Sequence, residues 1–291
     1  MIKRVSIVVF IAALFAPVAS QRQPEQTHRA YLPVIATPLT YSNVGIAWHR
    51  GGQSGAADAQ LIGAINGYFN SDTWAALPSD TGAVQIIWGM RKDVDFSHIA
   101  DMQCGEFIIG PNEPDRPDQA NLTPAETAAY LVMMSHVCPD STIVWWNGIW
   151  LGHLDASLTA VDGMGVHIDG LTVGIHLYSL WPDDDPNGRI DEACEILAAH
   201  GYECNLWVTE VGVCNEWPGA YYIAQDWLQQ TGDNQHVERI FWYTSSSGGY
   251  PTPCNYDLID NGELTIVGRA IRDAQNGHFP SRNLSISEIY D

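Results

Sequence analysis

The chain has 291 residues, of which 46% are hydrophobic, and it carries 34 acidic residues against 13 lysines and arginines. The formal net charge of −21 creates a field that repels nucleic acid and anionic membrane surfaces, so we expect neither as a partner. Such a charge does not prevent binding of a neutral polysaccharide, and the apolar content suffices for a sizeable core.

The N-terminus is typical of a signal peptide, which we assign to residues 1–20. Lys3 and Arg4 precede an apolar stretch, Val5–Phe15, and small residues that end at Ser20 form a cleavage site. The apolar stretch is shorter than the roughly 20 residues that a membrane span needs. We therefore predict a secreted, extracellular protein that begins near Gln21 and has no membrane contact after cleavage.

One domain is expected over residues 43–280, because no linker-like stretch rich in Gly, Ser or Pro interrupts it. Residues 21–42 form a predicted tether and residues 281–291 a tail. Short apolar runs predict eight strands, at Val44–Trp48, Gly67–Phe69, Val84–Trp88, Phe107–Gly110, Ile143–Trp146, Leu171–Tyr178, Leu206–Glu210 and Arg239–Thr244. Helical patterns lie between them, at Ala56–Ile65, Phe96–Met102, Pro124–Val137, Asp155–Val161, Arg189–His200, Ala220–Gln230 and Ile266–Ala274.

This regular alternation predicts an α/β fold, a (β/α)₈ TIM barrel. A doubly wound sheet shares the alternation, but no Gly-rich phosphate turn follows the first strand. The helix at Pro124–Val137 has a start signal, with Thr123 and Glu126 forming a capping box around a proline. In such a barrel, the reactive groups lie at the C-terminal ends of the strands.

Two glutamates stand at such positions. Glu113 follows the fourth predicted strand, between Asn112 and Pro114, and Glu210 ends the seventh. The fourth and seventh strands lie across the barrel mouth from one another, so the two carboxyl groups can face each other. Hydrolysis of a glycosidic bond needs two such groups, one as an acid and the other as a base or nucleophile. A lone glutamate is more often a surface residue, but two at strand ends predict a catalytic pair.

These motifs resemble those of a large group of retaining (β/α)₈ glycosidases, clan A of the glycoside hydrolases. Asn112, Glu113 and Pro114 are similar to its acid/base signature, and Thr209, Glu210 and Gly212 to its nucleophile strand. His176 and Tyr178, at the end of the sixth strand, resemble the clan's His-x-Tyr, and Trp242 resembles the aromatic platform under the cleaved sugar. The run from Gly110 to Asp115 is also similar to the compact β-1,3-glucanases of family 128.

The resemblance implies specific roles. Glu210 would be the nucleophile, Glu113 the acid/base, and Asn112 would hydrogen-bond the 2-hydroxyl of the bound sugar. Tyr178 would orient Glu210 and His176 would line the same site. The reaction would be a double displacement that needs no cofactor and no metal.

Tryptophans form a second theme, because sugar rings stack on indole. Many lie at or just beyond predicted strand ends: Trp48, Trp88, Trp145, Trp146, Trp150, Trp181 and Trp242. Core filling is the alternative role for each of them. We expect Trp48, Trp88, Trp146 and Trp242 to bind substrate, together with the polar Asn147.

Six cysteines in an exported chain predict disulfides. The sequence contains no Cys-x-x-Cys pair, which argues against a zinc site. On the barrel, Cys104 and Cys138 both lie at the bottom, Cys194 and Cys204 flank one turn, and Cys214 and Cys254 lie in neighbouring loops at the top. We predict these three bonds.

The sequence therefore predicts a monomeric, secreted glycoside hydrolase that cleaves β-glycosidic bonds of an extracellular polysaccharide. A β-1,3-glucan is the favoured substrate, with β-mannan, β-galactan and other β-glycans open. The alternatives are a glycan-binding barrel that has lost its activity and a barrel metallohydrolase. An esterase is disfavoured because no Gly-x-Ser-x-Gly elbow occurs.

Overall fold

The computed structural model describes residues 44–48, 68–70, 84–86, 104, 106–178, 184–243 and 254–278, all in the compact unit that spans Ala36–Asp291. The predicted signal peptide, tether and C-terminal tail lie outside these residues. The predicted helices Ala56–Ile65 and Phe96–Met102 lie outside them as well.

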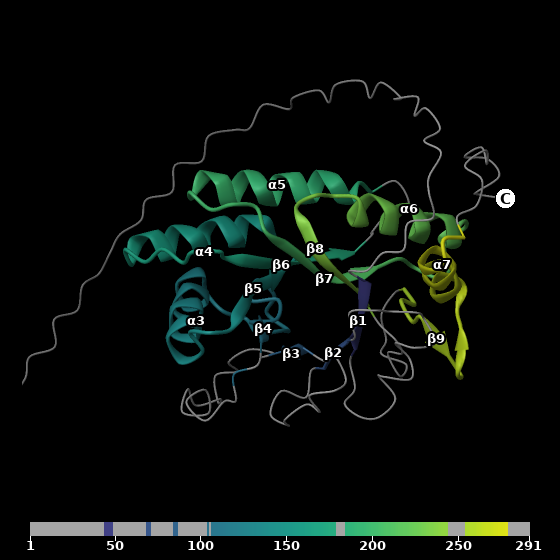
Figure 1. Ribbon diagram of the computed structural model, residues 1–291, viewed down its shortest axis with the longest axis horizontal. Coiled ribbons are helices and arrows are strands. Elements are labelled where there is room, and N and C mark those ends of the chain that lie inside the picture. Colours follow the sequence, from purple (N-terminus) through teal and green to yellow (C-terminus); the bar gives the residue numbers. More distant parts are fainter. Residues whose placement is uncertain are drawn as a thin grey trace, which may run out of the picture. The chain divides into compact units, whose positions relative to one another are not determined.

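Eight parallel strands close into a barrel in which each strand pairs with the next along the chain and the last pairs with the first (Figure 1). They are β1 (Val44–Trp48), β2 (Tyr68–Asn70), β3 (Val84–Ile86), β4 (Phe107–Gly110), β5 (Thr142–Gly148), β6 (Thr172–Tyr178), β7 (Leu206–Gly212) and β8 (Val237–Tyr243). The predicted TIM-barrel fold is thus confirmed. Because the strands are parallel, all of their C-terminal ends meet at one mouth.

Helices cover the outside of the barrel between the strands. Those described are α3 (Pro124–Val137), α4 (Leu151–Gly163), α5 (Pro186–Ala199), α6 (Ala220–Gly232) and α7 (Ile266–Gln275). Each packs against the next in the order α3 to α7, as expected for successive crossovers of one hand (Figure 1).

Local signals explain the start of α3 but not that of α4. Thr123 accepts the Glu126 backbone N–H and the Glu126 carboxylate accepts the Thr123 N–H, which is the predicted capping box. The fourth helix begins at Leu151, one turn before the predicted Asp155. Its first turn is held by a tertiary contact, because the carboxylate of Asp115 accepts the backbone N–H of Trp150.

Side chains of the barrel form two apolar layers with opposite parity along the strands. The smaller layer comes from strands alone and fills the barrel: Ala47, Ile109, Val144, Trp207 and Phe241. The larger layer joins alternate strand residues to the helices. On β8, for example, Ile240 and Trp242 belong to it whereas Phe241 does not. This period of two decides which residues at the strand ends face the barrel axis.

A two-stranded hairpin precedes the last helix and was not predicted. Strand β9 (Ile259–Asp260) pairs antiparallel with β10 (Glu263–Leu264). Asn261 and Gly262 form the turn with φ angles of 50° and 83°. Positive φ at both residues is the geometry of a type I′ turn, for which Asn-Gly is a strong sequence signal.

The three disulfides are those that the sequence predicts. Cys104 bonds to Cys138, which caps the C-terminus of α3. The second bond joins Cys194 of α5 to Cys204, just before β7, and the third joins Cys214, just after β7, to Cys254. The loop geometry of the barrel was sufficient to select these pairs.

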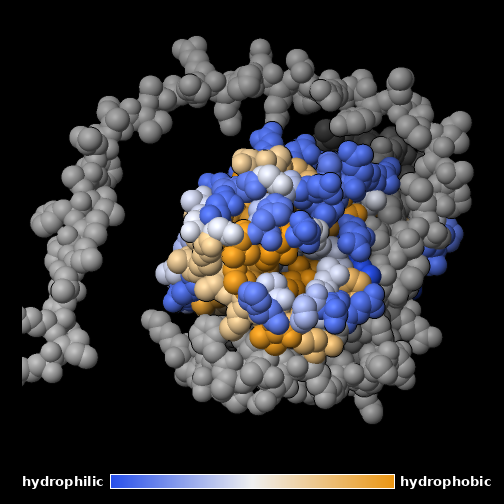
Figure 2. Space-filling model, turned by 60° about the vertical axis from the view of Figure 1, so that its left-hand side comes forward, coloured by the Kyte–Doolittle hydropathy of each residue, from blue (hydrophilic) through white to orange (hydrophobic). Residues whose placement is uncertain are grey.

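The described surface separates apolar from hydrophilic residues. On the face drawn in Figure 2, apolar residues gather around part of a central hollow, which hydrophilic residues border elsewhere. The arrangement fits a barrel of apolar strands enclosed by helices with polar outer faces. None of the described helices combines the length and apolar character that crossing a membrane requires.

Candidate active site

Glu113 stands just beyond β4 in a backbone conformation that is unusual for its residue type. Its φ is 42°, in the left-handed region where side chains other than glycine are uncommon. The backbone N–H of Glu113 donates to the carbonyl of Asn147, at the end of β5, over 2.8 Å. This bond fixes the β4 loop against its neighbour and directs the carboxyl group, which is only 4% exposed, into the barrel mouth.

Glu210 reaches the same space from β7. The phenolic hydroxyl of Tyr178, at the end of β6, donates to Oε2 of Glu210, as the resemblance implied. Gly212 allows this contact, because a Cβ there would lie 2.9 Å from the Tyr178 ring and 2.8 Å from that of Tyr256. The sequence therefore positions the second carboxylate with a hydrogen-bond donor from the adjacent strand.

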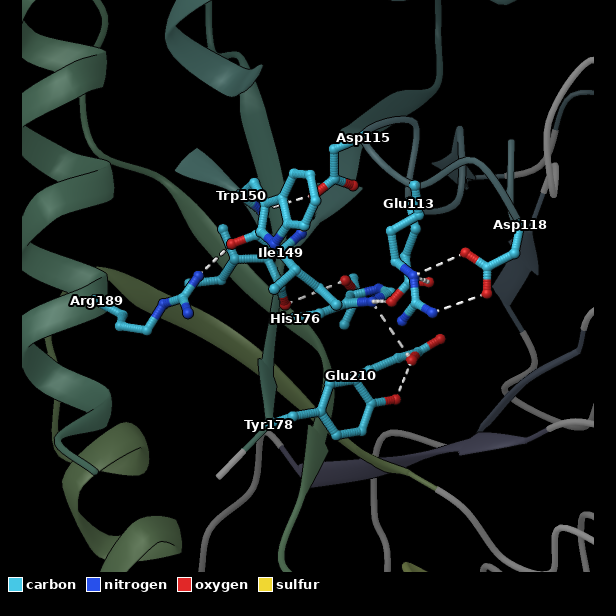
Figure 3. A network of polar contacts seen from close by, with 12 residues as sticks. Glu113, Asp115, Asp118, Ile149, Trp150, His176, Tyr178, Arg189 and Glu210 are labelled. Carbon is cyan, nitrogen blue, oxygen red and sulfur yellow. Dashed lines mark hydrogen bonds and ion pairs between the residues drawn. The ribbon is translucent and has the colours of Figure 1, made fainter. Parts of the chain in front are cut away.

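His176 lies between the two carboxyl groups (Figure 3). Its Nδ1 is 3.1 Å from Oε1 of Glu113 and 3.4 Å from Oε2 of Glu210. One oxygen of each glutamate and one nitrogen of His176 all lie within 4.8 Å of one another. The two glutamates that the sequence placed on opposite strands thus face each other at short range.

The charges of this buried cluster shift its pKa values. Burial lowers the pKa of His176, but the charge of Glu210 and the hydrogen bond and charge of Glu113 outweigh it, so the pKa is raised. Burial raises the pKa of Glu210, and the charge of Glu113 adds to this effect. His176, Tyr178 and Arg116 oppose it only in part. The ionised form of Glu210 is therefore favoured by these three neighbours.

Three charged residues after Glu113 contribute to the site, and the sequence reasoning missed them. Arg116 places its Nε 3.6 Å from Oε2 of Glu113 and donates twice to the carboxylate of Asp118. Asp115 accepts the backbone N–H groups of Ile149 and Trp150. Their signal in the sequence was the dense charge pattern directly after Glu113.

Two buried asparagines that adjoin Glu113 in the chain or through a backbone hydrogen bond have side-chain polar atoms without a partner among the described residues. Among the described residues, Oδ1 of Asn112 and both polar atoms of the Asn147 side chain have no hydrogen-bond partner. Asn147 fits only because residue 174 is glycine, where a Cβ would lie 1.7 Å from its Oδ1. Unpaired buried amides are costly, so their retention here is consistent with the predicted binding of sugar hydroxyls.

Two of the tryptophans predicted to contact the substrate, Trp146 and Trp242, lie in the core. Trp146 is completely buried in the larger apolar layer, and its indole N–H donates to His153. Trp242 is buried in the same layer, and the β8 aromatic beside Tyr178 is instead Tyr243, with ring centroids 5.7 Å apart. These positions do not support a sugar contact by Trp146 or Trp242. Alternation along β8 turns Trp242 toward the helices. Trp146 is turned toward His153 of α4 by its left-handed φ of 81°, where the register of β5 shifts.

Two further predicted contacts lie partly or wholly outside the described residues. The backbone of Trp48 ends β1, but its side chain is not described, and Trp88 falls outside the described ranges. Their predicted contacts with substrate remain predictions.

The described residues contain three clusters with the ligand types of a metal site. Two of them consist mainly of cysteines that form disulfides, Cys194 with Cys204 and Cys214 with Cys254. The third is the group of Glu113, His176 and Glu210 itself. Within it, His176 hydrogen-bonds Glu113 and lies 3.4 Å from Glu210, and two facing carboxyl groups with a donor to each suit acid/base and nucleophilic chemistry.

Known structures with this fold include three β-1,3-glucanases of family 128. An endo-acting enzyme from Amycolatopsis mediterranei, in complex with laminaritriose, is 19% identical with a TM-score of 0.60, covering 80% of this chain and 99% of that one. A curdlan-specific exo-acting enzyme from Blastomyces gilchristii is 22% identical, with a TM-score of 0.59 and coverages of 81% and 99%. An endo-acting enzyme from Sorangium cellulosum is 19% identical, with a TM-score of 0.59 and coverages of 80% and 98%. At these identities, the likeness establishes the shared fold.

The sequence comparisons carry the family assignment. No curated protein sequence matches the chain. The family model of the glycosyl hydrolase catalytic core matches residues 45–271, which include nearly the whole barrel, both facing glutamates and the His176–Tyr178 strand end. The chain belongs to the glycosyl hydrolase catalytic core family.

Proposed function

We propose that the protein is a secreted, retaining glycoside hydrolase that cleaves β-1,3-glucan, with Glu210 as nucleophile and Glu113 as acid/base. One observation supports the mechanism: one oxygen of each carboxyl group lies within 4.8 Å of the other, and both approach the same nitrogen of His176, at 3.1 and 3.4 Å. Retaining enzymes hold these groups about 5–5.5 Å apart, whereas inverting enzymes need about 6.5–9.5 Å to fit a water between them.

In the first step, the ionised carboxylate of Glu210 attacks the anomeric carbon of the bound sugar. The bond to the leaving oxygen breaks as that oxygen takes a proton from Glu113. In the second step, water attacks the same carbon, gives a proton to Glu113 and releases Glu210. Tyr178 stabilises the ionised Glu210 before attack and after release, and His176 keeps both carboxyl groups in register.

The choice of β-1,3-glucan rests on the structural relatives. The enzymes from Amycolatopsis mediterranei and Blastomyces gilchristii are named as β-1,3-glucanases and were crystallised with laminaritriose and glucose. Structures of the Amycolatopsis enzyme also include variants at two glutamates that are separated by the same number of residues as Glu113 and Glu210. The negative charge of this chain suits a neutral glucan and disfavours an acidic one.

Secretion is supported by the signal-peptide pattern of the first 20 residues and by the three disulfides, which persist in oxidising compartments. N-terminal sequencing of protein recovered outside the cell should find Gln21 or a close neighbour as the first residue. An intact Met1 on that material would contradict export by cleavage.

The stereochemistry of the first product tests the mechanism. With laminari-oligosaccharides as substrate, NMR within the first minutes should show the β-anomer, because two displacements restore the starting configuration. An α-anomer as the initial product would overturn the double displacement and leave only the family assignment.

Variants at each glutamate test the assigned roles. Glu210→Ala should abolish turnover, and added azide should restore part of it as an inverted α-glycosyl azide. Glu113→Ala should still react at the first step with dinitrophenyl glycosides, which need little protonation, and azide should then give a product of retained configuration. Glu203→Gln, at an exposed carboxylate before β7, is the matched control and should behave as wild type. If both active-site variants match wild type, the reaction occurs elsewhere.

A further inference from the structure

One large aromatic side chain is exposed beside the candidate active site. Trp150 lies two residues beyond the C-terminal end of β5 and is 63% exposed, the largest value among the described large apolar residues. It is the N-cap residue of α4, yet its side chain makes no capping bond. The exposed indole is thus not explained by the fold, unlike Trp145 and Trp146, which are completely buried.

The backbone that carries this indole is tightly fixed. Oδ2 of Asp115 accepts the N–H of Trp150 over 2.7 Å and that of Ile149 over 3.1 Å. The guanidinium of Arg189, on α5, donates to the carbonyl of Ile149. Figure 3 shows the Asp115 carboxylate reaching the backbone at Ile149 and Trp150. An exposed side chain on such a rigid base is preorganised to bind a ligand, because little backbone freedom remains to be lost on binding.

The same contacts tie Trp150 to the reacting groups. Asp115 lies two residues after Glu113, and the N–H of Glu113 donates to Asn147, three residues before Trp150. Hydrogen bonds therefore join the loop after β4 to the end of β5 and the loop that follows it at two places, from Glu113 to Asn147 and from Asp115 to Trp150. Any movement of Glu113 relative to Trp150 would have to break one of these bonds.

We propose that Trp150 is a stacking platform for a sugar unit of the glucan beyond the bond that is cleaved. In this assignment, Asp115 is the positioning residue that holds the platform in register with Glu113. The inference rests on the proposed function and names a part of the binding site for the same polysaccharide. An indole face suits the C–H face of a neutral sugar. The residues at the cleaved bond are nearly fully buried, with Glu113 at 4% and Glu210 at 6% exposure, so an exposed Trp150 belongs to a more distant unit.

Substrates of different length test this assignment. Trp150→Ala should raise KM for laminarihexaose about tenfold, the loss expected for one aromatic contact, with little change in kcat. The effect should be small for laminaritriose, which has fewer units to reach the platform. In the inactive Glu210→Gln background, calorimetry should show the same length-dependent loss of affinity. Trp150→Tyr should recover most of it, because a ring remains.

Two matched variants separate the platform from a general effect on the fold. Met164→Ala removes an exposed apolar side chain at the other end of α4 and should leave KM unchanged. Asp115→Ala should raise KM for laminarihexaose, and the double variant with Trp150→Ala should lose little more, because both changes remove the same contact.

The outcomes distinguish the two proposals. If wild type hydrolyses laminari-oligosaccharides and Trp150→Ala has an unchanged KM at every length, the platform is wrong and the proposed function stands. An equal loss for laminaritriose and laminarihexaose would also overturn it. If wild type neither binds nor cleaves these oligosaccharides, both the proposed substrate and the proposed role of Trp150 are wrong.

Discussion

Tyr178 illustrates how a single hydroxyl sets the state of a buried carboxylate. Burial and the neighbouring Glu113 raise the pKa of Glu210, which opposes the ionised form that a nucleophile needs. The hydrogen bond from Tyr178 and the charge of His176 act in the opposite sense. Both of these groups, which favour the ionised form of Glu210, come from one neighbouring strand, β6.

These opposing effects predict the pH dependence of the reaction. Because the proposed mechanism requires an ionised Glu210 and the pKa of this group is raised, the acidic limb of kcat/KM should lie above the ordinary glutamate pKa of about 4.3. Tyr178→Phe removes a donor that stabilises the ionised form, so the limb should move to still higher pH. The loss of a hydrogen bond to a charged group should also lower kcat/KM about 10- to 100-fold.

A pH–rate profile of wild type and Tyr178→Phe measures both effects. Tyr222→Phe, on α6 and distant from the network, is the control and should leave the profile unchanged. If the acidic limb of Tyr178→Phe stays where it is in wild type, the hydroxyl does not stabilise ionised Glu210.

At the scale of elements, the end of β5 is shaped by its neighbour β6. The register of the two strands shifts between Trp145 and Gly148, and Asn147 has a φ of 42°. The amide of Asn147 fills the space beside Gly174 that a side chain at position 174 would otherwise occupy. The buried amide, the bulge and the glycine therefore form one unit, although they come from two strands.

Gly174→Ala should disrupt this unit. The added Cβ would lie 1.7 Å from Oδ1 of Asn147, so we expect a loss of about 1–3 kcal/mol in the free energy of unfolding and a loss of activity. Denaturant titration measures the first. Adding Asn147→Gly, which tolerates the positive φ, should restore much of the stability but not the activity. Gly152→Ala, on α4 with open space around it, is the control and should not destabilise. A fully stable Gly174→Ala would refute the packing argument.

Helices α4 and α5 are joined by a histidine between two aspartates. His200, which caps α5, contacts Asp162 over 2.6 Å and Asp155 over 3.0 Å, both on α4. Burial lowers the pKa of His200, but these two partners raise it by more, so the net shift is upward. The stabilisation is therefore fully present below the ordinary histidine pKa of about 6.5 and is lost as the pH rises through the raised value.

His200→Gln should accordingly lower the free energy of unfolding more at pH 5 than at pH 8.5, as measured by denaturant titration at both pH values. His136→Gln, at an exposed position in the last turn of α3, provides the comparison and should show little difference between the two pH values. An equal loss for His200→Gln at both pH values would mean that the protonated form does not join the helices.

At the scale of the whole molecule, closure of the barrel and three disulfides constrain the chain. The bond between Cys214 and Cys254 spans 40 residues, from the end of β7 past β8, whereas that between Cys194 and Cys204 spans 10. A longer closed loop removes more conformational entropy from the unfolded chain. Replacing Cys214 and Cys254 by serine should therefore cost roughly 1 kcal/mol more than replacing Cys194 and Cys204. Thermal unfolding of the two double variants measures the difference, and the reverse order would show that native contacts outweigh loop entropy.

The sequence alone determined most of the regular elements and the residues of the candidate catalytic pair. Strands β1 and β4 and helix α3 begin and end at the predicted residues, because apolar runs, a capping box and a proline are local signals. Glu113 and Glu210 could be named because barrel topology brings strand ends to one mouth, and the three disulfides followed from the same topology. Tyr178 was named from the resemblance of the β6 end to the His-x-Tyr of clan A.

Only the tertiary structure decided which side of a strand end faces the site. Tyr243, and not Trp242, lies beside Tyr178, because strand parity is fixed by pairing across the barrel and not by residue type. The placing of His176 between both carboxyl groups, and of Asn147 over Gly174, likewise depends on contacts between different strands. Such contacts leave no local pattern in the sequence, since each partner alone is compatible with many environments.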